Sequence, residues 1–147
     1  MSTMKIMSIS LFFLFLLGIS AGPVSAIEKT IDEDSSPSRL LIVWTSGDKE
    51  VAMKMVHMYA FNAKKNKWWD TVRLLIWGPS QKLVAEDADI QEYIKKMKDI
   101  GIELYACKGC ADLYGIADKV AAQGVTVKYT GMDLTEWIKA GWTTITF

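Results

Sequence analysis

The sequence predicts an α/β protein with three layers, in which a five-stranded parallel sheet lies between helices. Short apolar runs alternate with longer amphipathic stretches from residue 39 to the end of the chain. The runs at 40–44 (LLIVW) and 72–77 (VRLLIW) are almost purely apolar, which is typical of strands buried on both faces. The crossovers between such strands are expected to be right-handed.

The same pattern places every element in order along the chain. Strands are expected at 40–44, 72–77, 102–106, 125–129 and 143–147. Helices are expected from 49 to about 65, at 83–99, at 111–123 and at 131–141.

Details of the helices follow from spacing. The first helix is expected to bury one face, formed by Val51, Met55, Met58 and Tyr59. The second should bury Ile90, Ile94 and Met97. Gly115 is expected to break the third helix, and the last helix carries Asp133 and Glu136 at the spacing of a capping box.

The N-terminus predicts an exported protein. One positive charge at Lys5 precedes an apolar run at 6–19, and Val24-Ser25-Ala26 offers the small residues that signal peptidase cleaves after. We therefore expect a signal peptide at 1–26 and no stable membrane span after cleavage, which implies a periplasmic or secreted location. Residues 27–38 are expected to form a flexible acidic leader, and 39–147 the single folded domain.

Charge excludes one class of partner. The chain carries 17 basic and 17 acidic side chains, and its lysines are scattered rather than clustered. A nucleic-acid-binding domain would show a basic patch or stripe. No nucleic-acid partner is expected.

In a parallel sheet, the loops that follow the strands meet at one edge, where ligands bind in open α/β folds. Cys107 and Cys110, the only cysteines in the chain, stand at that edge, just past the third strand. They are the candidate catalytic residues. Four further residues follow strands at this edge and are expected to line the Cys107 pocket: Ser46, Gly47, Gly78 and Lys108. Small loop residues of this kind are equally typical of simple turns.

Several roles remain open for the cysteine pair. A disulfide suits an oxidising compartment, although so small a loop gives little entropic stabilisation. A thioredoxin-type motif is disfavoured, because no proline follows the cysteines to supply a cis-proline loop. Structural zinc needs four ligands, and His57 is the only histidine. Binding of Cu(I) or another soft metal by Cys107 and Cys110 stays an alternative.

Over 39–147 the sequence resembles the DsrE/DsrF-like sulfur-relay superfamily. The resemblance rests on the first buried strand with its small-residue loop, the Cys-x-x-Cys after the third strand, Gly115-Ile116, and the tail WIKAGWTTITF. Family members carry a persulfide on a cysteine eight residues before a Gly-Ile or Gly-Val pair, and Cys107 holds that position. Cys110 matches a second cysteine found in part of the family.

The resemblance implies a five-stranded parallel sheet and a thiol protein that accepts and passes sulfane sulfur on Cys107. It implies sulfur donor and acceptor proteins as partners and a homo-oligomer, but no cofactor and no resident metal. The tandem Trp68-Trp69 suits either a subunit interface or packing against the sheet. A non-catalytic interaction domain with an inert disulfide is the remaining alternative.

Overall fold

The computed structural model describes residues 37–147, which fold around one sheet. Its strands are β1 (Arg39–Trp44), β2 (Thr71–Ile76), β3 (Glu103–Cys107), β4 (Thr126–Lys128) and β5 (Thr143–Thr146). All neighbouring strands are parallel, in the order β4-β3-β2-β1-β5. The predicted five-stranded parallel α/β fold is confirmed. The predicted signal peptide at 1–26 and residues 27–36 of the predicted leader lie outside the described residues.

Strand order explains which runs are apolar. The chain moves from β1 outward through β2 and β3 to β4, and then returns to the opposite edge, where β5 pairs with β1. β1, β2 and β3 therefore each have a strand on both sides, and β1 buries five of its six side chains and β2 four of six. β5 forms an edge, and its four residues are exposed. The continuous apolar runs at 40–44 and 72–77 thus mark the sheet centre.

One face of the sheet is covered by a helical rod made of α1 (Lys49–Val51), the π-helical segment η1 (Ala52–His57) and α2 (Met58–Lys65). The Asp48 side chain caps its start by accepting from the N–H groups of Glu50 and Val51. The residues this rod buries are Ala52, Val56, His57, Ala60 and Ala63.

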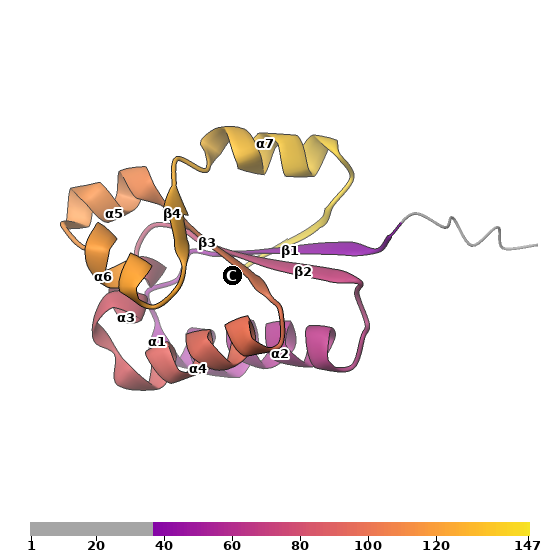
Figure 1. Cartoon of the computed structure of the whole chain (residues 1–147), viewed down its shortest axis with the longest axis horizontal. Coiled ribbons are helices and arrows are strands. Elements are labelled where there is room, and N and C mark those ends of the chain that lie inside the picture. Colours follow the sequence, from indigo (N-terminus) through magenta and orange to yellow (C-terminus); the bar gives the residue numbers. More distant parts are fainter. Residues whose placement is uncertain (1–36) are drawn as a thin grey trace, which may run out of the picture. The chain divides into compact units, whose positions relative to one another are not determined.

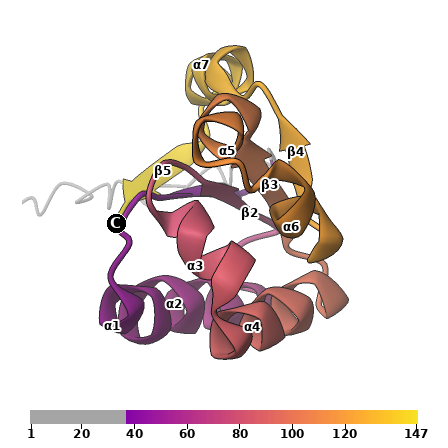
Figure 2. The ribbon, with the colours of Figure 1, turned by 90° about the vertical axis from the view of Figure 1, so that its left-hand side faces the viewer.

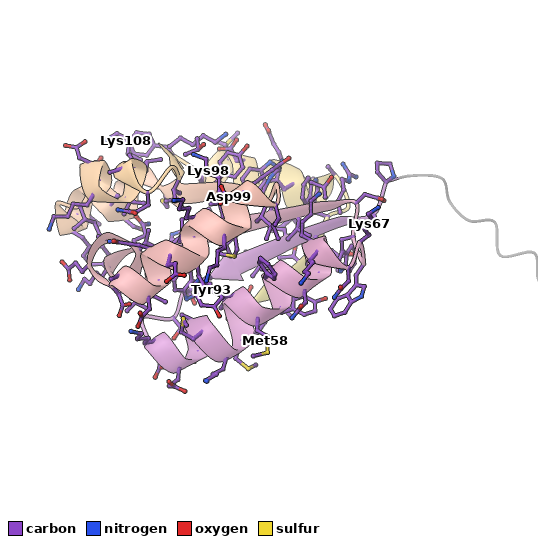
Figure 3. The ribbon with its side chains drawn as sticks, turned by 60° about the horizontal axis from the view of Figure 1, so that its bottom comes forward. Met58, Lys67, Tyr93, Lys98, Asp99 and Lys108 are labelled. Carbon is purple, nitrogen blue, oxygen red and sulfur yellow. The ribbon has the colours of Figure 1, made fainter. Side chains whose placement is uncertain are left out.

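The predicted buried face of this rod was wrong. Met55 and Met58 are about half exposed, at 51% and 52%, and Val51 and Tyr59 are only partly buried. Figure 3 shows Met58 projecting from the outer side of the rod. A π-helical turn places more residues in each turn than an α-helix does, so it rotates the residues beyond it relative to a 3.6-residue period. Ala52, Ala60 and Ala63 are buried instead, and a pattern based on large apolar side chains gives such small residues little weight.

The predicted helix at 83–99 is two helices, α3 (Ser80–Glu86) and α4 (Ala88–Asp99). Asp87 separates them because its backbone is extended and its side chain accepts from the N–H groups of Asp89 and Ile90. The predicted buried face of α4 is confirmed, since Ile90, Ile94 and Met97 are all inaccessible to solvent.

The helical region after β3 is likewise divided, as predicted, at Gly115. α5 (Lys108–Tyr114) ends where Gly115 adopts a φ of 66°, and α6 (Ala117–Ala122) follows. A positive φ is readily adopted by glycine because it has no Cβ atom.

The opposite face of the sheet is covered by α7 (Gly131–Lys139), which Figures 1 and 2 show on the side away from α2 and α4. α7 has no fully buried residue. Its contact with the sheet is an aromatic layer over β1 to β3, formed by Trp77, Tyr105, Trp137 and Trp142 together with Leu134, around the buried Leu41, Val43 and Leu75.

The guanidinium of Arg73, on β2, lies in the middle of this layer. It stands 4.1 Å from the ring centre of Trp142, 4.3 Å from that of Trp137 and 5.2 Å from that of Tyr105. Glu103 on β3 pairs with it. A cation among aromatic faces is attracted by the ring quadrupoles, so Arg73 links the helix to the sheet.

The capping box predicted for α7 does not form. Thr130 precedes the helix and its side chain makes no capping hydrogen bond. Asp133 instead pairs with Lys128, with 2.7 Å between Oδ1 and Nζ. Because its carboxylate binds Lys128, Asp133 does not cap the N-terminus of the helix as the sequence spacing had predicted.

Candidate functional site at the carboxyl edge of the sheet

The two cysteines lie at the end of β3. Cys107 is its last residue and also the residue before α5, with extended backbone (φ −72°, ψ 112°). Cys110 stands in the first turn of α5. Cys107 is 9% exposed and Cys110 is half-buried, and both are free thiols in the described part of the chain. The strand-to-helix junction thus holds one sheltered and one more accessible sulfur close together.

Two buried side chains from the start of α3 tie together the ends of the three central strands. The Ser80 hydroxyl donates to the carbonyl oxygen of Trp44, at the end of β1, at 2.7 Å. The Gln81 amide nitrogen donates to the carbonyl oxygens of Ile76, at the end of β2, and Cys107, at the end of β3, at 3.3 and 3.1 Å. This bracing fixes the backbone from which the Cys107 side chain projects.

The surroundings of Cys107 favour its thiolate. Burial alone would raise the pKa of the Cys107 thiol, because a charge is poorly solvated away from water. The backbone N–H of Cys110, the side chains of Thr130 and Cys110, and the backbone N–H of Thr130 act in the other direction. They outweigh burial, and the pKa of Cys107 lies below its ordinary value.

Thr130, between β4 and α7, was missed by sequence reasoning. Its side chain is completely buried, and its hydroxyl has no hydrogen-bond partner, sulfur included, within residues 37–147. That hydroxyl nevertheless lowers the pKa of Cys107. The hydroxyl thus affects the charge of the Cys107 sulfur without forming a hydrogen bond to it here, since a neutral thiol accepts hydrogen bonds poorly, whereas a thiolate accepts them well. The sequence signal was weak, since Thr130 is merely a small polar residue after a strand.

Cys110 differs from its neighbour. Burial is the main reason that the pKa of the Cys110 thiol lies above its ordinary value, and the nearby Cys107 sulfur raises it further. The backbone N–H of Gly78 and the indole N–H of Trp77 oppose this without reversing it. The pair therefore divides into a thiolate-prone Cys107 and a thiol-prone Cys110.

The predicted pocket residues are spread over this edge. Gly78 meets Cys110 through its N–H. The Lys108 ammonium binds both carboxylate oxygens of Asp112, at 2.6 and 2.8 Å, so its charge is compensated. The Ser46 hydroxyl accepts from the N–H of Asp48, and Gly47 packs against Pro79. A lining role for these four residues stays a prediction.

Metal ligands do not gather around the cysteines. Over residues 37–147, no three His, Cys, Asp or Glu side chains come together in an arrangement that would hold a metal ion. His57 is completely buried between Trp44, at 5.1 Å between ring centres, and Tyr93, at 5.4 Å. Figure 3 places Tyr93 on α4, between that helix and α2. The histidine is therefore part of the helical layer, and burial lowers its pKa to about 4.

The described residues also contain no helix that is both long and apolar enough to cross a membrane.

The described residues form an α/β protein with two free thiols where its third parallel strand ends. The chain belongs to the DsrE/DsrF-like family, whose sequence profile matches residues 47–147. The match includes both cysteines and every strand except β1.

Solved structures agree with this membership. BT1422, a conserved protein of unknown function from Bacteroides thetaiotaomicron, is 37% identical with a TM-score of 0.73, and the match covers 75% of this chain and 95% of that one. The ychN protein from E. coli (17% identity, TM-score 0.61) and MTH1491 from Methanobacterium thermoautotrophicum (16% identity, TM-score 0.62) share the fold. Each of these two matches covers 75% of this chain and 99% of the other. No curated protein matches the sequence.

Proposed function

We propose that this protein is an exported sulfur carrier, which accepts sulfane sulfur as a persulfide on Cys107 and passes it to an acceptor thiol. The observation that carries the proposal is the contrast between the two sulfurs: the pKa of Cys107 is lowered and that of Cys110 is raised. Membership in the DsrE/DsrF-like family, which the sequence resemblance links to sulfur relay, supports a role in sulfur transfer for the more acidic of the two thiols.

The transfer step needs no cofactor and no net oxidation. The Cys107 thiolate attacks the outer sulfur of a donor persulfide, R–S–SH. A bond forms between the Cys107 sulfur and that outer sulfur, while the donor S–S bond breaks and R–S⁻ leaves with the electron pair. The product is Cys107–S–SH. Attack on its outer sulfur by an acceptor thiolate reverses the roles and regenerates the Cys107 thiolate.

Cys110 acts as a resolving thiol in this proposal. Its thiolate attacks the inner sulfur of the Cys107 persulfide, forms the Cys107–Cys110 disulfide and expels HS⁻. This reaction ends the relay. The raised pKa of Cys110 keeps it mostly protonated, which slows the attack and lengthens the lifetime of the persulfide.

Export and assembly complete the proposal. The leader sequence favours a mature chain that begins at Ile27, which N-terminal sequencing of cell-derived protein would check. The second copy in a homo-oligomer is proposed to cover an apolar groove of about 440 Å³ between the helical rod and the edge strand β5. The exposed Trp68 and Ile145 line it, whereas Trp69 packs against the core.

The oligomer has its own test. Light scattering of the wild-type chain should give a multiple of the monomer mass, and Trp68→Glu should lower it, because a charge would enter the apolar contact. Lys67→Glu, on the neighbouring exposed residue, is the control and should leave the mass unchanged. A wild-type monomer at all concentrations would refute the assembly.

The carrier function is tested by loading the reduced full chain with cysteine persulfide and weighing its tryptic peptides. Trypsin cuts after Lys108, so Cys107 and Cys110 fall in separate peptides, 99–108 and 109–119. One added sulfur, about 32 Da, should appear on peptide 99–108. Cys107→Ser should abolish the gain, and Cys110→Ser should retain it for longer than wild type.

The rival functions give different results in the same variants. A soft-metal site would lose Cu(I) affinity alike in Cys107→Ser and Cys110→Ser, because each removes one of two thiolates. An inert disulfide would change stability without any sulfur or metal phenotype. Equal sulfur loading in wild type and Cys107→Ser would refute the carrier proposal.

A further inference from the structure

We propose that the Thr130 hydroxyl donates a hydrogen bond to the sulfur of Cys107 when that sulfur is a thiolate, and that it stabilises the anionic sulfur during transfer. The second half of this inference rests on the proposed carrier function. The first half concerns the thiol alone and stands without it.

The topology places Thr130 beside Cys107. In the pairing of β3 with β4, Cys107 lies opposite Lys128. Thr130 follows two residues later, beyond the end of β4 and immediately before α7. Both residues thus leave neighbouring parallel strands at the same edge of the sheet. Gly109 lies between this segment and the sulfur. A Cβ atom added at Gly109 would stand 3.8 Å from the ring of Tyr129, which precedes Thr130, and 4.0 Å from the Cys107 sulfur.

The Thr130 hydroxyl needs a partner that the rest of its surroundings do not supply. The residue is completely inaccessible to solvent, and no oxygen, nitrogen or sulfur atom among the described residues forms a hydrogen bond with its Oγ1. Most buried polar side-chain atoms in proteins do have a partner, because leaving one unpaired is unfavourable. The Cys107 sulfur satisfies the hydroxyl when it is a thiolate, and the hydroxyl in turn lowers the pKa of Cys107.

The charged groups around the site leave this hydrogen bond without a competing cation. On α5, Lys108 is paired with Asp112, and the Tyr129 hydroxyl lies 3.5 Å from that carboxylate. Across β4 and α7, Lys128 is paired with Asp133. From α3 comes Gln81, which is neutral and bonds the Cys107 carbonyl. Cys110 is a further titratable neighbour; its side chain also lowers the pKa of Cys107, and its own pKa is raised.

The hydrogen bond has a defined place in the transfer step. When an acceptor thiolate attacks the outer sulfur of Cys107–S–SH, the electron pair of the breaking S–S bond moves to the Cys107 sulfur. The Thr130 hydroxyl donates to the thiolate that forms there, so Cys107 becomes a better leaving group. The same bond stabilises the nucleophile in the loading step.

The test compares the pH profile of Cys107 alkylation in wild type, Thr130→Val and Thr130→Ser, measured on peptide 99–108 of the full chain. Thr130→Val keeps the side-chain shape and removes the hydroxyl, so the midpoint of Cys107 alkylation should move to higher pH. A rise of one unit in the pKa of Cys107 would lower its alkylation rate at neutral pH about tenfold. Thr130→Ser should keep the wild-type midpoint. The control is Thr135→Val, which removes an exposed hydroxyl bonded to Gly131 on the same helix and should have no effect.

An unchanged midpoint in Thr130→Val, or an equal shift in Thr130→Ser, would overturn the proposal. A measurement on wild type covers the case in which Thr130→Val does not fold. The Thr130 hydroxyl proton should give a slowly exchanging NMR signal that shifts as Cys107 titrates, and a signal insensitive to that titration would overturn the proposal too. Sulfur loading is measured separately. If wild type never loads sulfur, the carrier function fails, while the alkylation profiles still decide the role of Thr130.

Discussion

The side-chain amide of Gln81 donates a hydrogen bond to the backbone carbonyl oxygen of Cys107, with 3.1 Å between the two atoms. The same amide reaches Ile76, so one buried side chain joins the ends of β2 and β3. The sulfur-bearing residue is thereby held by a polar brace from a helix 26 residues earlier in the chain.

Gln81→Leu should lower the free energy of unfolding by about 1–3 kcal/mol, because two buried carbonyl oxygens lose their donor. Urea unfolding would measure the change. The control is Glu86→Ala on the same helix, an exposed position at which a change within about 0.5 kcal/mol is expected. Equal stability of Gln81→Leu and wild type would show that the brace has no energetic role.

The two cysteines should alkylate with separate pH profiles. Cys107, whose pKa is lowered, should reach half its maximal rate at a lower pH than Cys110, whose pKa is raised. Absolute rates also depend on access, and Cys107 is the more buried of the two, so the midpoint is the quantity to compare. Iodoacetamide labelling of reduced protein, followed on peptides 99–108 and 109–119, would measure both. Coincident midpoints would contradict the division of roles.

His57 should make the protein less stable in acid. Burial lowers its pKa from 6.5 to about 4, so the unfolded chain takes up a proton more readily than the folded one. Its contribution is fully present above pH 6.5 and is lost as the pH falls toward 4. The full difference corresponds to roughly 3 kcal/mol.

Unfolding of wild type and His57→Phe at pH 7.5 and pH 5 tests this histidine effect. Phenylalanine keeps the ring between Trp44 and Tyr93 but cannot be protonated. The variant should therefore lose much less stability between the two pH values. The same loss in both proteins would assign the acid sensitivity to other groups.

Arg73 should anchor α7 to the sheet. Arg73→Leu removes a guanidinium that lies over Trp137 and Trp142, and should cost about 1–2 kcal/mol of stability. Arg73→Lys is the matched variant: it keeps the charge but loses the planar stacking, so an intermediate effect is expected. Tryptophan fluorescence would report the change directly. Wild-type stability in both variants would mean that the aromatic layer holds α7 without the cation.

The fold was predictable because the short, mostly apolar strand segments differ clearly in composition from the amphipathic helical segments between them. Apolar runs such as 40–44 occur where a strand is covered on both faces, and five short strand-like runs alternating with helices leave few arrangements other than a parallel sheet. The position of Cys107 at the carboxyl edge followed from the same reasoning.

The errors have physical causes of a different kind. The buried face of the first helical rod was misassigned because η1 shifts the helical phase, so that Ala60 is buried while Met58 is half exposed. The break at Asp87 depends on a side chain that caps the next helix, and Asp133 pairs with Lys128 instead of forming a cap.

The supporting residues of the site were missed for a third reason. Gln81 and Thr130 are ordinary polar residues in the sequence, and their importance comes from burial against a strand end far away in the chain. No local pattern predicts which polar side chain becomes buried in that way. Only the packing of α3, β3 and β4 brings them to Cys107.

The central claim is that Cys107 carries sulfur in the native protein. The most direct measurement isolates the protein from the cells that produce it, caps all thiols and persulfides with iodoacetamide without reductant, and weighs the tryptic peptides. Peptide 99–108 should occur in a form heavier by about 32 Da than its capped thiol, with no such form of peptide 109–119. Because Cys110 can resolve the persulfide to a disulfide, the same measurement is made on Cys110→Ser. If peptide 99–108 carries only the capped thiol in that variant as well as in wild type, the carrier account is contradicted.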